Sequence, residues 1–126
     1  MDAPDIPSIL ADSRSVAVVG WSLKADRPRH WIAAYLEKEA GYRVFRVNPV
    51  AESTAERPVW PDLTSVPEPP DVVDVFRAPQ HLPAVVAEAA KCGAKVVWMQ
   101  PGAENEAAAA AARGEGLTAV VGECLY

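Results

Sequence analysis

The stretch Ser15-Val16-Ala17-Val18-Val19-Gly20 decides the fold class of this chain. A short run of small and β-branched apolar residues that ends in glycine is typical of a strand buried on both faces of a parallel sheet. Similar runs recur further along the chain, and segments with helical spacing separate them. This alternation predicts an α/β fold, a doubly wound parallel sheet with helices on both faces, in three layers.

Outward from this stretch, the pattern predicts about five strands, at residues 15–20, 43–47, 71–76, 94–99 and 118–121. A helix is expected to start at Pro28 and to stop before Gly41, and further helices are expected at 79–91 and 105–113, with a short leading helix at 6–11. Residues 51–70 hold five of the 12 prolines, so we expect an ordered connection there with a short extended piece at Val59–Trp60.

Length and composition limit the possible functions. A chain of 126 residues is expected to form a single domain, 1–126, with one site. The net charge of -5 argues against nucleic acid as a partner, and no apolar run approaches the roughly 20 residues of a membrane span. The N-terminus begins with acids rather than an apolar signal segment, which favours a cytoplasmic location.

In an open parallel sheet, ligands bind beyond the carboxyl ends of the strands, near the point where the strand order reverses. Gly20 would allow close approach of a phosphate to the backbone, and Ser22 would add a hydroxyl donor; a plain turn glycine with a helix-capping serine is an equal alternative. Arg27, next to Pro28 at the start of the expected helix, is favoured as a phosphate partner over a solvated charge.

The later strand ends carry further candidates. Asn48 could bond a ribose or adenine edge, or Asn48-Pro49 could be an ordinary turn. Arg77 is expected to face a ligand or to form a salt bridge with Asp74, and Phe76 is more readily a core residue than an adenine platform.

The sequence lacks the motifs of several common cofactor-binding, catalytic and metal sites. The first loop lacks the Gly-x-Gly-x-x-Gly motif, and Asn48 stands where a dinucleotide site has an acid, so NAD is disfavoured. His30 and His81 have no nucleophile or acid at a motif spacing, and neither cysteine lies in Cys-x-x-Cys. We therefore assign no catalytic residue and no metal ligand.

An ordered set of motifs spans nearly the whole chain. It includes Val16-Ala17-Val18-Val19-Gly20-Trp21-Ser22, Val47-Asn48-Pro49 and Asp71-Val72-Val73-Asp74-Val75-Phe76-Arg77-Ala78-Pro79, with further pieces at 26–28, 41–44, 60–63, 93–100 and 123–124. This set resembles the small bacterial CoA-binding proteins, relatives of the N-terminal domain of the succinyl-CoA synthetase alpha subunit.

The resemblance implies a Rossmann-like fold that binds coenzyme A or an acyl-CoA as a non-catalytic module, alone, as a homo-oligomer or with an unknown protein partner. One alternative is the nucleotide-binding subunit of an acyl-CoA ligase or transferase whose catalytic groups lie on another chain, and a less favoured one is an NAD-binding oxidoreductase fragment. Relatives often carry a basic residue after Asn-Pro, where this chain has Val50, so the 3′-phosphate would rely on Arg27, Arg29 or Arg46. The expected ligand-binding residues are Gly20, Trp21, Ser22, Arg27, Pro28, Asn48, Pro49, Phe76, Arg77, Pro79, Gln100 and Gly102.

Overall fold

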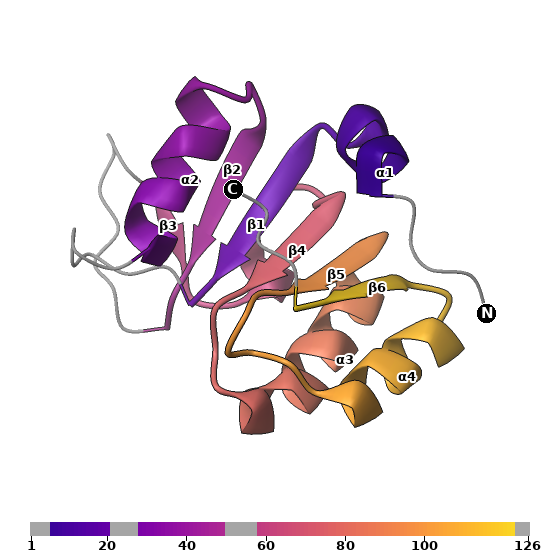
Figure 1. Cartoon of the computed structure of the whole chain (residues 1–126). Coiled ribbons are helices and arrows are strands. Elements are labelled where there is room, and N and C mark those ends of the chain that lie inside the picture. Colours follow the sequence, from indigo (N-terminus) through magenta and orange to yellow (C-terminus); the bar gives the residue numbers. More distant parts are fainter. Residues whose placement is uncertain (1–5, 21–27, 50–57, 123–126) are drawn as a thin grey trace.

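Six parallel strands form one open sheet in the order β3-β2-β1-β4-β5-β6 (Figure 1). This computed structural model describes residues 6–20, 28–49 and 58–122 of the chain. The strands are β1 (Ser15–Val19), β2 (Arg43–Val47), β3 (Val59–Trp60), β4 (Val72–Val75), β5 (Val96–Met99) and β6 (Thr118–Val121). The predicted doubly wound parallel sheet is confirmed.

The edge strand β3 raises the number of strands above the expected value of about five. Val59 pairs with Arg46 and Trp60 pairs with Val47, so the extended piece predicted within the proline-rich connection joins the sheet. The ring of Trp60 also packs edge-on against Phe45, with 5.4 Å between ring centroids. A strand of two residues is too short to show the alternating pattern by which strands are recognised in a sequence. Only its pairing with β2 identifies it as a strand.

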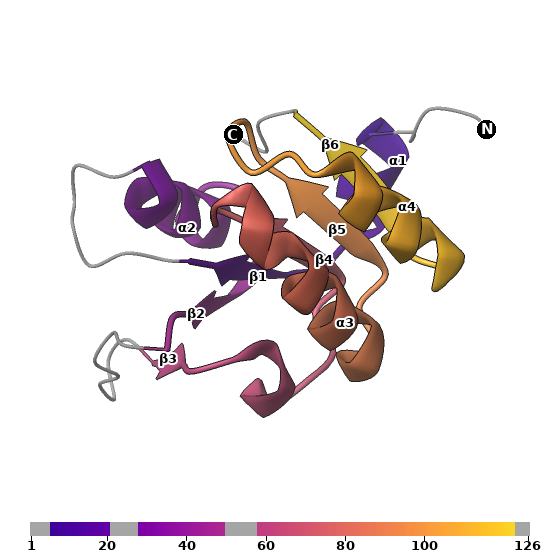
Figure 2. The same ribbon diagram turned by 90° about the horizontal axis from the view of Figure 1, so that it is seen from below.

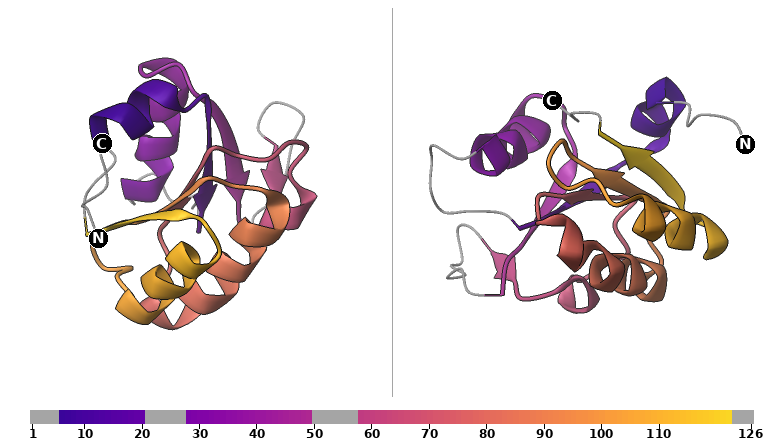
Figure 3. Two further views of the ribbon diagram at one scale, coloured as in Figure 1. Left: turned by 90° about the vertical axis from the view of Figure 1, so that its right-hand side faces the viewer. Right: turned by 60° about the horizontal axis from the view of Figure 1, so that its bottom comes forward.

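Four helices cover the two faces of the sheet (Figures 2 and 3). One face carries α1 (Ile6–Asp12) and α2 (Pro28–Lys38), and the other carries α3 (Leu82–Cys92) and α4 (Glu106–Gly114). Short 3-10 turns precede α3 at Pro79–His81 (η2) and follow β3 at Leu63–Ser65 (η1). The expected helices are therefore all present, and the one expected at 79–91 begins with the 3-10 turn.

Alternate residues of each strand supply two separate apolar layers. Val73, Val75 and Met99 pack toward α3 and α4, whereas Val18 and Trp98 pack toward α1 and α2. Both faces of the central strands are buried, which explains why their sequences are continuous apolar runs without polar alternation. The exception is Asp74, which lies in the middle of β4 and is completely buried.

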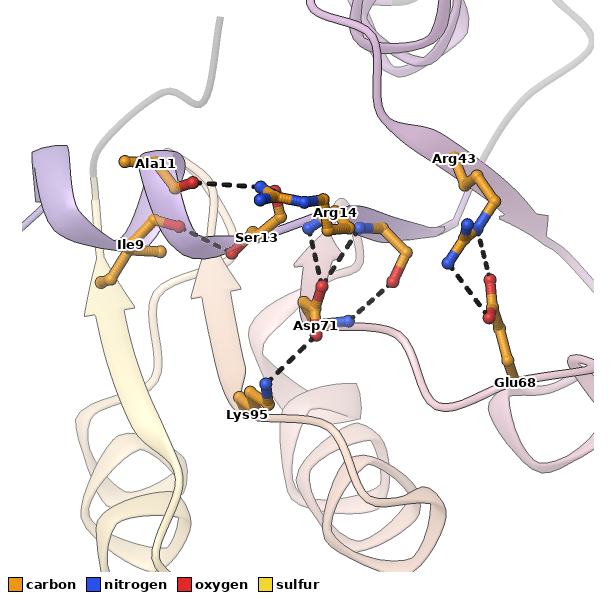
Figure 4. Close-up of polar contacts among 9 residues, drawn as sticks. Ile9, Ala11, Ser13, Arg14, Arg43, Glu68, Asp71 and Lys95 are labelled. Carbon is orange, nitrogen blue, oxygen red and sulfur yellow. Dashed lines mark hydrogen bonds and ion pairs between the residues drawn. The ribbon is translucent and has the colours of Figure 1, made fainter.

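The amino ends of the strands are joined by a polar cluster around Asp71 (Figure 4). One carboxylate oxygen of Asp71 accepts hydrogen bonds from the backbone N–H groups of Arg14 (2.7 Å) and Ser15 (3.3 Å), and the other lies 3.6 Å from the ammonium of Lys95. Nearby, the guanidinium of Arg43 bonds Glu68 at 2.6 Å. These contacts stabilise the edge of the sheet opposite the carboxyl ends.

Within the described ranges, no helix is long and apolar enough to cross a membrane.

Candidate functional site

The strand order reverses between β1 and β4, and the carboxyl ends of these strands define the candidate site. Each chain segment that leaves this edge is tied to the neighbouring strand by one backbone hydrogen bond. The N–H of Gly20 donates to Val47 (2.9 Å), that of Phe76 to Val19 (2.9 Å), and that of Gln100 to Val75 (3.3 Å). The structure thus places Gly20, Phe76 and Gln100 side by side, as the sequence predicts.

Gly20 lies where β1 and β4 come closest at this edge. Its φ of +87° belongs to the left-handed region, and a Cβ atom there would lie 2.8 Å from the carbonyl oxygen of Phe76 and 3.0 Å from Cγ of Arg77. Backbone conformation and space therefore both require glycine. Phe76 and Arg77 occupy the space that a side chain would fill, so this glycine allows the close approach of the ends of β1 and β4. Its role toward a ligand stays a prediction.

A buried carboxyl lies beneath this turn. Asp74 is 0% exposed, and its Oδ1 accepts a 2.6 Å hydrogen bond from Nε2 of Gln100, which is itself buried. Among the residues that the structure describes, Oδ2 of Asp74 has no hydrogen-bond partner. Because burial penalises the charged form, the pKa of Asp74 rises from 3.8 to about 7, although the bond from Gln100 lowers it in part.

Sequence reasoning missed this contact. Asp74 bonds Gln100, so the alternative that placed it in a salt bridge with Arg77 is wrong. Asp74 pairs with Trp98 across the sheet, and Gln100 lies two residues further along the same face. The register of β4 and β5 thus brings the two side chains together, and an acid inside an apolar strand was the available signal.

Arg77 lies on the opposite face, toward α3. It lines a cavity of about 40 Å³ together with Gly20 and Pro49 from the strand ends and the acids Asp62 and Glu88. The carboxylate of Glu88 accepts the backbone N–H of Leu63 at 3.1 Å, which anchors η1 beside this cavity. Arg77 is half-buried, and its expected role as a ligand-facing or paired arginine stays a prediction.

The other predicted residues have varied surroundings. Asn48 is half-buried, and its N–H donates to Trp60 at 2.9 Å, whereas Pro49 is exposed. Phe76 is half-buried and packs against the apolar layer under α1 and α2, which supports its core reading. Pro79 begins η2, and the exposed Gly102 donates its N–H to Glu104 at 2.8 Å.

The first loop falls largely outside the described residues. Trp21, Ser22 and Arg27 lie there, and their expected roles stay predictions. Pro28 is the first residue of α2, as expected. Arg46, one of three arginines considered for a 3′-phosphate, is buried and bonds Glu37 of α2 at 3.2 Å, so its charge is already neutralised.

The fold places the chain in the Rossmann-like class of α/β domains. The model of the CoA binding domain family matches residues 14–126, and the chain belongs to that family.

The chain is also similar to several individual proteins. The chain is 33% identical to the uncharacterized protein YneT of Bacillus subtilis over 121 residues, which are 96% of this chain and 89% of that protein. It is 37% identical to a hypothetical protein from Pyrococcus horikoshii, with a TM-score of 0.90, over 96% of this chain and 84% of the other. An acetyl-coenzyme A synthetase from Ca. Korarchaeum cryptofilum shares the fold at 22% identity and a TM-score of 0.70, over 83% of this chain and 25% of that one.

Proposed function

We propose that this chain binds coenzyme A, or an acyl-CoA, through the nucleotide and pyrophosphate as a non-catalytic binding module. The observation that carries the proposal is the switch point between β1 and β4, where Gly20, Phe76 and Gln100 lie side by side at the strand ends, in a chain of the CoA binding domain family. The segment after Gly20 leads to the amino end of α2 at Pro28, and a helix amino end favours a phosphate through its free N–H groups and its dipole.

The remaining residues fit different parts of such a ligand. Ser22 and Arg27, with the positive end of the α2 dipole at Pro28, would hold the pyrophosphate. Asn48 and Pro49 would surround the adenosine, whereas Phe76 packs against the core beside them. Trp21, Arg77, Pro79, Gln100 and Gly102 complete the proposed set on the other strand ends.

A second candidate function is that of a nucleotide-binding subunit of an acyl-CoA ligase, with the catalytic groups on another chain. The fold shared with one quarter of an acetyl-coenzyme A synthetase favours it. A pull-down that recovers a stoichiometric ligase-like chain supports this function, and a homo-oligomer alone supports the stand-alone module. Either role is compatible with the proposed cytoplasmic location.

Calorimetric titration with three ligands tests the proposal. We expect micromolar binding of CoA by the nucleotide-stripped protein, weaker binding of dephospho-CoA and no binding of NAD, because Asn48 stands in the place of a ribose-binding acid. Failure of all three ligands to bind would overturn the proposal and direct the search to a protein partner. Equal affinity for CoA and dephospho-CoA would show that the 3′-phosphate makes no contact.

Replacement of Arg27 tests the pyrophosphate contact. Arg27→Ala is expected to weaken CoA binding by about 1.5 to 3 kcal/mol, the range for hydrogen bonds to charged groups. Arg43→Ala is the matched control, because this arginine is exposed at the amino ends of the strands, where it pairs with Glu68. Equal dissociation constants for the two variants would remove Arg27 from the site.

A further inference from the structure

Asp74 occupies the centre of a row of side chains that crosses the sheet on the face covered by α1 and α2. Val18 of β1 pairs with it on one side and Trp98 of β5 on the other. Arg46 of β2 follows beyond Val18. The carboxyl is therefore enclosed by two apolar neighbours, with Gln100 as its hydrogen-bond partner.

No cation among the described residues neutralises this carboxyl. Arg46 is two strands away, which is about 10 Å, and it pairs with Glu37 of α2. Arg77 lines the cavity on the opposite face. Among the side chains that the structure describes, the other titratable groups on this face are the phenols of Tyr35 from α2 and Tyr42 after it, while α1 contributes Ile6, Ile9 and Leu10.

The carboxyl also lies close beneath the proposed phosphate position. Gly20 comes two residues after Val18, the strand partner of Asp74, so the two levels are separated by about 7 Å. An anion on the Gly20 turn would therefore face a buried group that water does not reach. An ionised Asp74 would repel such an anion, whereas a protonated Asp74 would not.

We propose that binding of the anionic nucleotide is coupled to protonation of Asp74, so that protein molecules with an ionised Asp74 take up a proton from solution as the ligand binds, and the ligand binds more weakly at alkaline pH. This inference rests on the proposed function, because it requires a phosphate at the switch point. The proton converts the carboxylate to a neutral acid, whose Oδ1 keeps the bond from Gln100. The unpartnered Oδ2 is the atom that carries the proton.

The expected change in affinity follows from the charges. Burial raises the pKa of Asp74 to about 7, so both protonation states are populated in the free protein near neutral pH. Two residues along a strand and one strand across give about 8.5 Å between the charges, and repulsion between unit charges at this distance, at an effective dielectric constant near 20, corresponds to roughly 30-fold in affinity. We therefore expect the dissociation constant of CoA to rise at least about tenfold between pH 6 and pH 8.5.

Calorimetry with CoA tests this coupling. At pH 7.5, titration in two buffers of different ionisation enthalpy is expected to show proton uptake by the unsubstituted protein and none by Asp74→Asn. Glu68→Gln is the matched control, since it removes an exposed carboxylate near the amino ends of the strands and is expected to keep the uptake. Any ionisation of CoA itself appears equally in all three proteins and is subtracted by the comparison.

A second readout does not depend on a variant. The carboxyl carbon of Asp74, followed by NMR in labelled protein, is expected to titrate about one pH unit or more higher with CoA than without it. CoA binding without proton uptake, or with an unchanged Asp74 titration, overturns the inference and leaves the proposed function intact. Absence of CoA binding at every pH overturns both.

Discussion

At pH 8, Asp74→Asn is expected to be more stable than the unsubstituted protein by a margin about 3 kcal/mol larger than at pH 5. The pKa of Asp74 rises from 3.8 in the unfolded chain to about 7 in the folded one. Between these values the folded protein retains a proton that the unfolded chain has lost. Stability therefore falls as the pH rises through this window, by about 1.4 kcal/mol per unit, and then levels off.

An asparagine at this position avoids the loss because its amide stays neutral. Its oxygen can accept the hydrogen bond that Nε2 of Gln100 now donates to Oδ1, so the packing is preserved. Urea unfolding at pH 5, 6, 7 and 8 measures the margin at each pH. Glu68→Gln, which changes an exposed carboxylate, serves as the control. A margin that stays constant across this range would contradict the buried, proton-holding state of Asp74.

Gly20→Ala is expected to destabilise the protein by about 2 to 4 kcal/mol and to abolish detectable CoA binding. Two costs add at this position. The φ of +87° is strained for alanine, and the new methyl group would lie 2.8 Å from the carbonyl oxygen of Phe76, a backbone atom that the β4 ladder holds in place. Relief of the clash would move the ends of β1 and β4 apart and change the strand ends at the proposed phosphate position.

Alanine variants at two other glycines distinguish the cost of the positive φ from the cost of the steric clash. Gly41 and Gly102 have φ values of +78° and +94°, and a Cβ at either would meet nothing within 4 Å. Alanine there is expected to show the conformational cost alone, about 1 to 2 kcal/mol. Unfolding midpoints and CoA titrations of the three variants provide the comparison. If Gly20→Ala were no less stable than Gly102→Ala, the close approach of β1 and β4 would have no energetic consequence.

At Gly20 and at Asp74, the sequence predicted that the residue is unusual but not which residue it contacts. The glycine after the first strand was recognisable, because a conformation-permissive residue at the end of an apolar run marks a tight turn. The clash that makes it necessary was not, since it involves Phe76, which is far away in the chain and adjacent only in the sheet. Asp74 likewise stood out as an acid in an apolar strand, but its partner Gln100 depends on the register of β4 and β5.

By itself, the sequence determined the class of fold, the positions of the main strands and helices, and the edge of the sheet where a ligand should bind. These features follow from local periodicity and from the general topology of parallel sheets. Only the tertiary structure decided that Val59–Trp60 is a strand, that Asp74 bonds Gln100, and that Arg46 is already paired with Glu37. Each of these depends on which residues of distant segments become neighbours, and neighbours across a sheet are set by strand register and packing rather than by local sequence.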